Sequence, residues 1–318
     1  MIERRRIALF SRWVLLLAAA APLSAQAPAQ ISVRQLADGV WAAVTPFGSN
    51  VGWFEVGDGV VVVDTGADAA TARAILSEIG ATAKKPVRRV VLTHEHSDHI
   101  GGVRVFAQAG AEIVAQEKGA GTDLYFLQSA PDTEATGPKP PRTQGLLTFS
   151  ERILVVGGPR RYELYFLGDA HTNNDVLVYL PDQKVLFTGD VVNYKRLPFL
   201  RSASCNPESW QKAVERISAL PVDQVVPGHG EPGADAKNGI QDTGVYLRRV
   251  NELAQMFIEQ QIPEDLYAFK LRDPENRIEN VPVTDDHIAN VTAAVKWRKA
   301  KYEAAKTTPT PKPAAPKG

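Results

Sequence analysis

The sequence predicts an α/β protein built from packed layers of strands and helices. Apolar runs of strand length alternate with segments of helical periodicity up to residue 128, and four further strand-length runs lie between residues 151 and 188. Strand, helix and strand in succession is the order of elements in layered α/β folds. With 318 residues, 44% of them hydrophobic and 23% charged, the chain can bury one large core or two smaller ones.

The first strands are expected between residues 31 and 64, at 39–45, 50–56 and 60–63. Gly57-Asp58-Gly59 predicts a hairpin turn before the last of them. Residues 60–63 are all valine and apolar toward both faces, so this strand should lie inside a sheet. The next elements expected are a helix over 69–79 with Asp68 as its N-cap, an interior strand over 88–93, helix 100–109, a strand near 112–115 and a helix over 116–128.

The second half of the chain begins with a predicted long loop. Residues 131–144 contain four prolines and no apolar period, which is typical of a loop that lines a site or of a plain surface loop. A helix over 207–219 is expected to start from Asn206 as N-cap with Pro207 in its first turn. The other elements expected are strands near 151–156, 162–167, 176–180, 184–188 and 223–227, and helices over about 235–261 and 285–305. The tail 307–318, rich in Pro, Lys and Ala, is predicted to be disordered.

Residues 1–25 predict a signal peptide. Arginines at positions 4, 5, 6 and 12 precede an apolar run over 13–23, and small residues follow. Cleavage after Ala25 is preferred to cleavage after Ala27, which would leave Pro28 next to the cut. The alternative, a membrane anchor, is disfavoured because the run has eleven residues and a spanning helix needs about 20. We therefore expect a periplasmic or secreted protein without stable membrane insertion after cleavage, exported by either the general secretory or the twin-arginine route.

Charge and cysteine content narrow the classes of partner. Removing residues 1–25 takes away four arginines and Glu3, so the formal net charge moves from 0 to about −3. This balance disfavours a nucleic-acid partner and leaves a small-molecule substrate as the expected ligand. Cys205 is the single cysteine, so no internal disulfide can form, and a buried thiol is favoured over a reactive one. The sequence leaves the oligomeric state open.

The decisive feature for function is the run Thr93-His94-Glu95-His96-Ser97-Asp98-His99 at the end of a predicted strand. Imidazole and carboxylate groups are the ligands that suit Zn²⁺, and few structural roles require so many of them together. Residues two apart at a strand end point the same way, so His94 and His96 can bind one metal ion while Asp98 and His99 face a second. Gly101 and Gly102 would let the following helix pack close to this turn.

Three more short motifs follow predicted strands. They are Gly168-Asp169-Ala170-His171-Thr172, Phe187-Thr188-Gly189-Asp190 and Pro227-Gly228-His229-Gly230. Asp190 alone would be an ordinary turn residue, but beside the other motifs it is interpreted as a ligand whose two oxygens can bridge two metals. His287, the one histidine outside these motifs, is interpreted as an exposed helix residue.

Together the H-x-H-x-D-H run, the lone His171, the Thr-Gly-Asp and the Pro-Gly-His-Gly resemble the motif set of the metallo-β-lactamase superfamily over residues 31 to about 232. The resemblance implies a four-layer αββα sandwich over 31–232 with the metals at one edge. The predicted helices that follow are interpreted as a C-terminal helical extension over 233–306 packed on it. The resemblance implies two Zn²⁺ ions, although iron or manganese would accept the same donors. It also implies the ligands: His94, His96 and His171 for the first ion, Asp98, His99 and His229 for the second, Asp190 between them, and Asp64 supporting them from outside.

The resemblance further implies a hydrolase in which a metal-bridging hydroxide attacks the carbonyl of a small ester, thioester, lactone or lactam. Asp98 would be the catalytic residue that orients the nucleophile and returns a proton. Basic residues after Asp190, among them Lys195, Arg196 and Arg201, could meet an anionic substrate or form a solvated loop. Trp53 and Tyr125 are either rim aromatics or, as favoured, core residues.

Two other functions stay open. The best-known zinc β-lactamases have Cys or Ser where this chain has Asp190, and a bridging Asp is typical of glyoxalase II-like, lactonase-like and phosphodiesterase-like members. A class B-like β-lactamase is therefore the second hypothesis. The third is a non-catalytic metal-binding or partner-binding protein of the envelope, for which the C-terminal helices would offer a surface.

Overall fold

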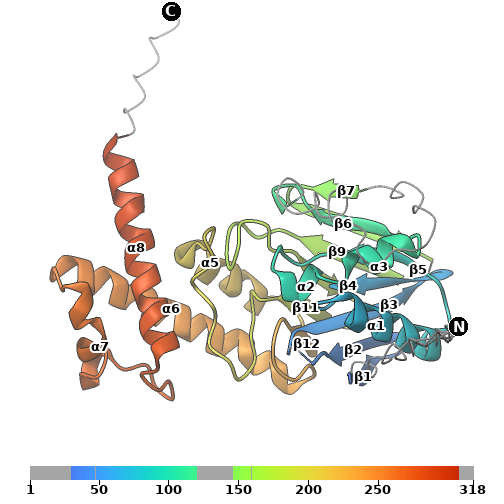
Figure 1. Ribbon diagram of the computed structural model, residues 1–318, viewed down its shortest axis with the longest axis horizontal. Coiled ribbons are helices and arrows are strands. Elements are labelled where there is room, and N and C mark those ends of the chain that lie inside the picture. Colours follow the sequence, from blue (N-terminus) through green and yellow to red (C-terminus); the bar gives the residue numbers. More distant parts are fainter. Residues whose placement is uncertain (1–29, 47, 120–145, 159, 308–318) are drawn as a thin grey trace, which may run out of the picture.

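Two β-sheets lie face to face in the computed structural model, which describes residues 30–46, 48–119, 146–158 and 160–307 (Figure 1). The seven-stranded sheet has the order β1(Ser32–Ala37), β2(Val40–Val44), β3(Asn50–Val56), β4(Gly59–Val63), β5(Val87–Val91), β6(Glu112–Gln116), β7(Leu146–Phe149). The five-stranded sheet has the order β12(Gln224–Pro227), β11(Val185–Gly189), β10(Leu177–Leu180), β9(Arg160–Tyr165), β8(Arg152–Gly157). Strands β4 to β7 pair in parallel, as do β11 and β12, and all other neighbours are antiparallel.

Three apolar clusters separate four layers, as the αββα expectation requires. The middle cluster joins the facing sides of the two sheets, for example Phe54 of β3 with Phe187 of β11. The second lies between the seven-stranded sheet and the helices α1(Ala69–Thr82) and α3(Val103–Gln108). The third lies between the five-stranded sheet and the helices α5(Pro207–Ser218), α6(Asn238–Glu259) and α8(Asp285–Thr307). The α/β prediction and its layer order are therefore confirmed.

Strand β4 shows how the sequence sets this arrangement. All five of its residues are buried, and it pairs with β3 on one side and β5 on the other. Val60 and Val62 pack toward the helices, whereas Val61 and Val63 pack toward the second sheet. A strand that is apolar on both faces can be satisfied only between two covered layers.

The predicted helix starts are also confirmed. The Asp68 carboxylate accepts the Thr71 amide at 2.7 Å at the start of α1, and Asn206 accepts the Ser209 amide at 3.1 Å at the start of α5. Such caps satisfy amides that the first helical turn leaves without a partner.

The helix expected over 100–109 is instead two short helices, α2(Ser97–Ile100) and α3. A Cβ on Gly101 would lie 2.0 Å from the Ala67 carbonyl oxygen, and a Cβ on Gly102 would lie 2.5 Å from the Thr65 carbonyl oxygen. The two glycines therefore allow the close approach that the sequence suggested, while the chain bends between the helices.

Other boundaries differ from the prediction. Strands β1 and β7 were not expected, and neither were the short helices η3(Glu264–Leu266), α7(Tyr267–Lys270) and η4(Pro274–Asn276). Gln116 ends a strand instead of starting a helix, and the rest of the helix expected over 116–128 lies largely outside the described residues, as do the loop 131–144 and Tyr125.

The C-terminal helices lie at one end of the molecule, with α6 against α5 and α8 standing out from the sheets (Figure 1). A short helix η2(Asp235–Lys237) leads into α6. The interpretation of His287 as an exposed residue was wrong, since it is 1% exposed and its Nδ1 lies 3.1 Å from the Tyr246 hydroxyl. The first turn of α8 packs against α6, and the two preceding aspartates hid this from the sequence pattern. Trp53 and Cys205 are buried, as favoured.

Among the described residues, no helix has the length and apolar character needed to cross a bilayer. The predicted signal peptide and the predicted disordered tail, apart from Thr307 at the end of α8, lie outside the described residues.

Candidate metal centre

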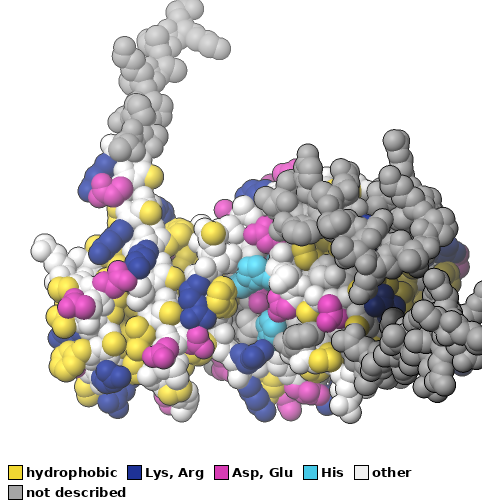
Figure 2. Space-filling model, in the orientation of Figure 1, with side chains coloured by type: hydrophobic (Ala, Val, Ile, Leu, Met, Phe, Trp, Pro, Cys, Tyr) yellow, Lys and Arg dark blue, Asp and Glu magenta, His cyan; other side chains and the backbone are white. Residues whose placement is uncertain are grey.

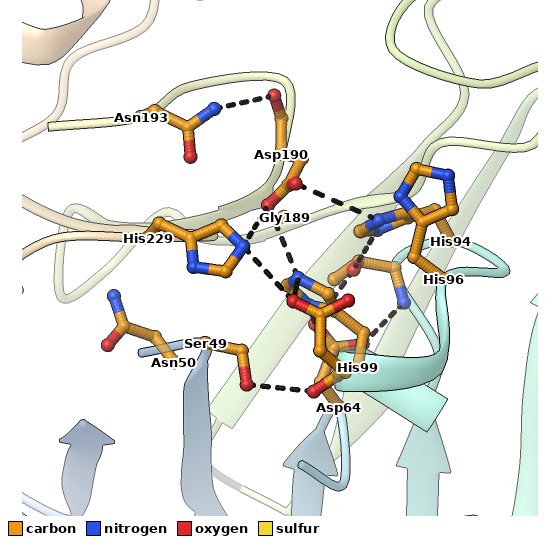
Figure 3. Close-up of polar contacts among 12 residues, drawn as sticks. Ser49, Asn50, Asp64, His94, His96, His99, Gly189, Asp190, Asn193 and His229 are labelled. Carbon is orange, nitrogen blue, oxygen red and sulfur yellow. Dashed lines mark hydrogen bonds and ion pairs between the residues drawn. The ribbon is translucent and has the colours of Figure 1, made fainter. Parts of the chain in front are cut away.

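The seven predicted ligands meet at one edge of the sandwich, although they come from four separate segments. Four follow β5, one follows β11, one follows β12 and one lies in the connection between β9 and β10. Figure 3 labels five of them, His94, His96, His99, Asp190 and His229, where the two sheets meet. Histidines with adjacent acidic groups are visible near the middle of one face of the molecule (Figure 2). The residues are His94, His96, Asp98, His99, His171, Asp190 and His229.

They form two groups that could each hold a metal ion. One contains His94, His96, His171 and Asp190, the other Asp98, His99 and His229, and the ligand atoms within each group lie within 4.8 Å of one another. This division is the one that the resemblance implied. Asp190 lies between the groups, with Oδ2 3.5 Å from His171 Nε2 and Oδ1 3.3 Å from His99 Nε2. The structure therefore brings together every predicted site residue.

The donor atoms fit divalent cations. His94 Nε2, His99 Nε2 and Asp190 Oδ1 are buried and have no hydrogen-bond partner among the described residues. Polar atoms buried in this way are destabilising unless something else satisfies them. Neutral imidazole and carboxylate are donors that Zn²⁺ accepts. Metal ions would thus satisfy the atoms that the protein itself leaves open.

The electrostatics favour positive charge at this place. Burial lowers the pKa of His94 well below its usual value and that of His171 to about 4, which keeps both rings neutral and able to bind a cation. Burial also opposes charge on His99, but the carboxylates of Asp190 and Asp64 raise its pKa well above the usual value. Burial opposes charge on Asp190 as well, yet the surrounding histidines hold its pKa well below the usual range. A divalent cation would supply the positive charge that these carboxylates favour.

Four of the histidines present Nε2 to the site and bind the protein through Nδ1. Such contacts fix which nitrogen carries the proton and how the ring is oriented. The Nδ1 partners are Thr93 Oγ1 for His94 at 3.1 Å, Asp64 Oδ2 for His99 at 2.8 Å, the Phe199 carbonyl for His171 at 3.1 Å and the Gly48 carbonyl for His229 at 2.9 Å. His96 is turned the other way, with its Nδ1 2.9 Å from His171 Nε2.

Asp64 supports both groups at once. It accepts the Thr93 amide at 2.8 Å and the Thr93 hydroxyl at 2.7 Å, besides the His99 ring. Because the Thr93 hydroxyl donates to Asp64, it accepts from His94 Nδ1. Asp64 has a φ of 64°, a backbone conformation that Asp and Asn tolerate better than most residues. The supporting role that the resemblance implied for Asp64 therefore has a specific geometry.

The first glycine of the Pro-Gly-His-Gly motif, Gly228, is required because there is no room for a side chain beside Asp190. A Cβ on Gly228 would lie 1.8 Å from Asp190 Oδ1, so the chain leading to His229 passes directly against the Asp190 carboxylate. Only glycine allows this approach.

Sequence reasoning missed several residues that hold the site. Gly48 and Phe199 act through backbone carbonyls, which no side-chain pattern can indicate. Ser49 donates its hydroxyl to the Asp98 carbonyl at 2.8 Å, and Asn290 of α8 reaches the chain around Phe199. Both are common surface residues, and their role depends on contacts far apart in the sequence.

A cleft of about 520 Å³ opens above the metal groups. Its walls include Phe199, Arg201 and the start of α8, and its floor includes His96, Asp98, Asp190 and His229. Of the predicted basic residues, Arg196 lines the cleft with Nη1 3.1 Å from His229 Nδ1, and Arg201 pairs with Asp286 at 2.8 Å. The Lys195 amine lies 5.0 Å over the Tyr194 ring and does not line the cleft.

The sequence profile of the metallo-beta-lactamase superfamily matches residues 44–229, which is more than half of the chain. The chain belongs to the metallo-beta-lactamase superfamily. This match contains all seven candidate ligands, and members of the superfamily are metal-dependent hydrolases.

Individual members of the superfamily resemble the chain at lower identity. A linear primary-alkylsulfatase of a Pseudomonas species is 26% identical over 219 residues, which cover 56% of this chain but only 40% of the relative. A metallo-beta-lactamase type 2 of Bacillus cereus is 27% identical over 224 residues, covering 64% of this chain and 78% of the relative. A metallo-beta-lactamase structure from Pontibacter korlensis superposes with a TM-score of 0.57 at 28% identity, covering 69% of this chain and 99% of that one.

Proposed function

We propose that the protein is a dinuclear-zinc hydrolase that attacks the carbonyl of a small ester, thioester, lactone or lactam. The observation that carries the proposal is the pair of ligand groups at the floor of an open cleft, in which three buried polar atoms have no hydrogen-bond partner in the part of the chain that the structure describes. His94, His96 and His171 would hold the first ion, Asp98, His99 and His229 the second, and Asp190 would contact both. When bound, two zinc ions would lower the pKa of a water molecule and polarise the substrate carbonyl.

The residues of the chain would then orient the reactants. Asp98 Oδ2 lies 3.2 Å from His229 Nε2 and 3.6 Å from His99 Nε2, and the Asp98 side chain is partly exposed to the cleft. Its carboxylate can therefore accept a proton from the attacking water and return it to the leaving group. The buried pair of Asp64 and Thr93 keeps the rings of His94 and His99 fixed while this happens.

We further propose that the substrate carries an anionic group. Arg196 lines the cleft, and among the described residues no carboxylate pairs with it. A guanidinium group at this position can form charge-assisted hydrogen bonds to a carboxylate or a sulfate. Of the basic residues after Asp190, Arg196 is thus the one that we propose binds the anionic group of the substrate.

A second candidate is lactam hydrolysis as the main activity. It is favoured by the relatives named metallo-beta-lactamase and opposed by Asp190, which replaces the Cys or Ser of the best-known zinc β-lactamases. Hydrolysis of a lactam panel at ordinary enzymatic rates would establish it, and failure across the panel would remove it.

The test combines metal content with turnover. Purified protein should contain about two zinc ions per chain, lose turnover in excess chelator and regain it with Zn²⁺. The substrate panel would contain esters, thioesters, lactones, lactams and a primary alkyl sulfate, the last because one relative is named an alkylsulfatase. Full activity in excess chelator would refute the proposal. Metal uptake without hydrolysis of any compound would favour the non-catalytic alternative.

We also propose that residues 1–25 direct export. The arginines before a short apolar run and the small residues after it support this. Mass spectrometry of the protein from a periplasmic fraction should give a chain that begins at Gln26. An intact Met1 in protein from that fraction would contradict cleavage.

A further inference from the structure

The C-terminal helix α8 reaches the metal centre through one buried side chain. Asn290 is 1% exposed, and its amide nitrogen donates to the Pro198 carbonyl at 2.7 Å. Its amide oxygen accepts the Leu200 backbone amide at 3.1 Å. Asn290 thus holds the chain on both sides of Phe199.

The orientation of the Asn290 amide is fixed by its partners. The Pro198 carbonyl can only accept and the Leu200 amide can only donate, so nitrogen and oxygen cannot exchange places. The nitrogen also donates to the Tyr246 hydroxyl at 3.0 Å, and this hydroxyl lies 3.1 Å from His287 Nδ1. Buried hydrogen bonds between α6 and α8 therefore hold the Asn290 side chain in place.

Besides the apolar packing of Leu197 and Leu200, few contacts hold this segment. Within the described part of the chain, no backbone-to-backbone hydrogen bond is made by residues 195–201. The Arg201 guanidinium lies 4.5 Å over the Phe199 ring and pairs with Asp286, which is also on α8. Helix α8 therefore supplies a buried hydrogen-bonded contact through Asn290 and an exposed ion pair through Asp286 to this wall of the cleft.

Phe199 connects the support to a candidate ligand. Its carbonyl accepts from His171 Nδ1 at 3.1 Å, which leaves Nε2 without a proton and turned toward the first metal group. A shift of the Phe199 carbonyl would release the ring or change the nitrogen that carries the proton. Partners of this kind change metal affinity by about 10- to 100-fold when they are lost.

We propose that Asn290 is a positioning residue for the first metal group, so that α8 completes the metal centre from outside the region matched by the superfamily profile. The inference rests on the proposed function only in that His171 binds a metal ion. It states that removing Asn290 weakens metal binding through Phe199 and His171, without any contact between Asn290 and the metal.

The test is the zinc affinity of Asn290→Ala, measured by titration of the apo protein against a chromophoric chelator. We expect one of the two stepwise dissociation constants to rise about 10- to 100-fold and the other to change less than about threefold. Asn251→Ala is the matched control, because Asn251 is also buried in the helical layer and donates to the Pro207 carbonyl and to Gln211, both at 3.0 Å. Wild-type affinities in folded Asn290→Ala, or an equal rise in the control, would overturn the proposal.

Two further measurements cover the case in which Asn290→Ala does not fold. Asn290→Asp keeps the size and the acceptor toward Leu200 but places an acceptor against the Pro198 carbonyl, so it should weaken the same dissociation constant. In the wild-type protein, zinc should slow hydrogen exchange of the Leu200 amide, because coupling between two sites is reciprocal. An exchange rate that is the same in apo and zinc-loaded protein would overturn the proposal. None of these readouts needs turnover, so a failed substrate panel refutes the hydrolase and leaves this inference standing.

Discussion

At the scale of single residues, the site depends on side chains that never touch a substrate. The ligand types could be predicted from the sequence because their chemistry is specific: few roles other than metal binding place three imidazoles and a carboxylate within six positions. Their outer partners could not, apart from Asp64, since backbone carbonyls and a lone Asn carry no chemical signature in a sequence. Metal affinity and substrate preference should nevertheless depend on them.

Asp64→Asn tests the carboxylate that supports His94 and His99. Asn tolerates the φ of 64°, so the backbone conformation should be kept. The Asn amide nitrogen, however, would face the Thr93 hydroxyl or His99 Nδ1, which donate to the carboxylate in the wild type. We expect zinc affinity to fall by about 10- to 100-fold. Chelator competition measures this. Asp68→Asn is the control, because Asn is an equally good N-cap, and it should bind zinc as the wild type does. Equal affinities in the two variants would contradict the role given to Asp64.

Arg196→Met tests the anionic substrate. Because the guanidinium lines the cleft but is exposed, we expect KM to rise about 10-fold for substrates with a carboxylate or sulfate and to stay unchanged for neutral analogues. Lys195→Met is the matched control, since it removes a neighbouring positive charge outside the cleft. An equal rise for charged and neutral substrates would show that Arg196 has no charge-dependent role.

At the scale of elements, secondary structure was predicted correctly where a short stretch of sequence itself shows the burial or the helix cap. The buried strand β4 and the capped starts of α1 and α5 were predicted for this reason. Strand β1 was missed because half of its residues are exposed at the sheet edge, which leaves no apolar run to detect. Helix 100–109 was predicted as one element because the bend between α2 and α3 is set by the carbonyls of Thr65 and Ala67, which are distant in sequence.

The buried His287 of α8 should make stability depend on pH. Burial lowers the pKa of His287, so the folded protein favours the neutral ring. The unfolded chain takes up a proton below pH about 6.5, and the free energy of unfolding should therefore fall as the pH drops below this value. His287→Gln cannot take up this proton, so its free energy of unfolding should fall less steeply. Urea unfolding at saturating zinc between pH 7 and pH 5 measures the difference, and parallel curves for the two proteins would exclude this contribution.

At the scale of the whole molecule, the layer order could be predicted but the place of the C-terminal helices could not. The alternation of elements predicted a layered α/β fold, and the resemblance to the superfamily implied two sheets with helices outside them. The position of α8 depends on its contact with α6 and on a few polar groups such as Asn290, and a mixed polar and apolar helix does not indicate which neighbour it meets. The sequence therefore predicted which side chains gather in the candidate metal centre better than it predicted the wall that encloses them.

Chelation should loosen the whole sandwich, because each metal group takes ligands from both halves. His94, His96, Asp98 and His99 follow a strand of the first sheet, whereas His171, Asp190 and His229 belong to the second. At free zinc of 1,000 times Kd, one ion stabilises the folded state by about 4 kcal/mol, so we expect Tm to be at least about 8 °C higher with zinc than with chelator. Calorimetry measures this, and an unchanged Tm would mean that the folded protein gains nothing from the ions.

The lack of room beside Gly228 has a consequence for how the protein can evolve. A methyl group there would collide with the carboxylate of Asp190, although Gly228 has no side chain that could bind a metal ion. Its mutational tolerance should therefore match that of a candidate ligand, and a descendant that acquires any side chain at this position would have to rebuild the turn or displace the Asp190 carboxylate. Gly228, which has no side chain, thus limits which substitutions near Asp190 can be accepted during evolution.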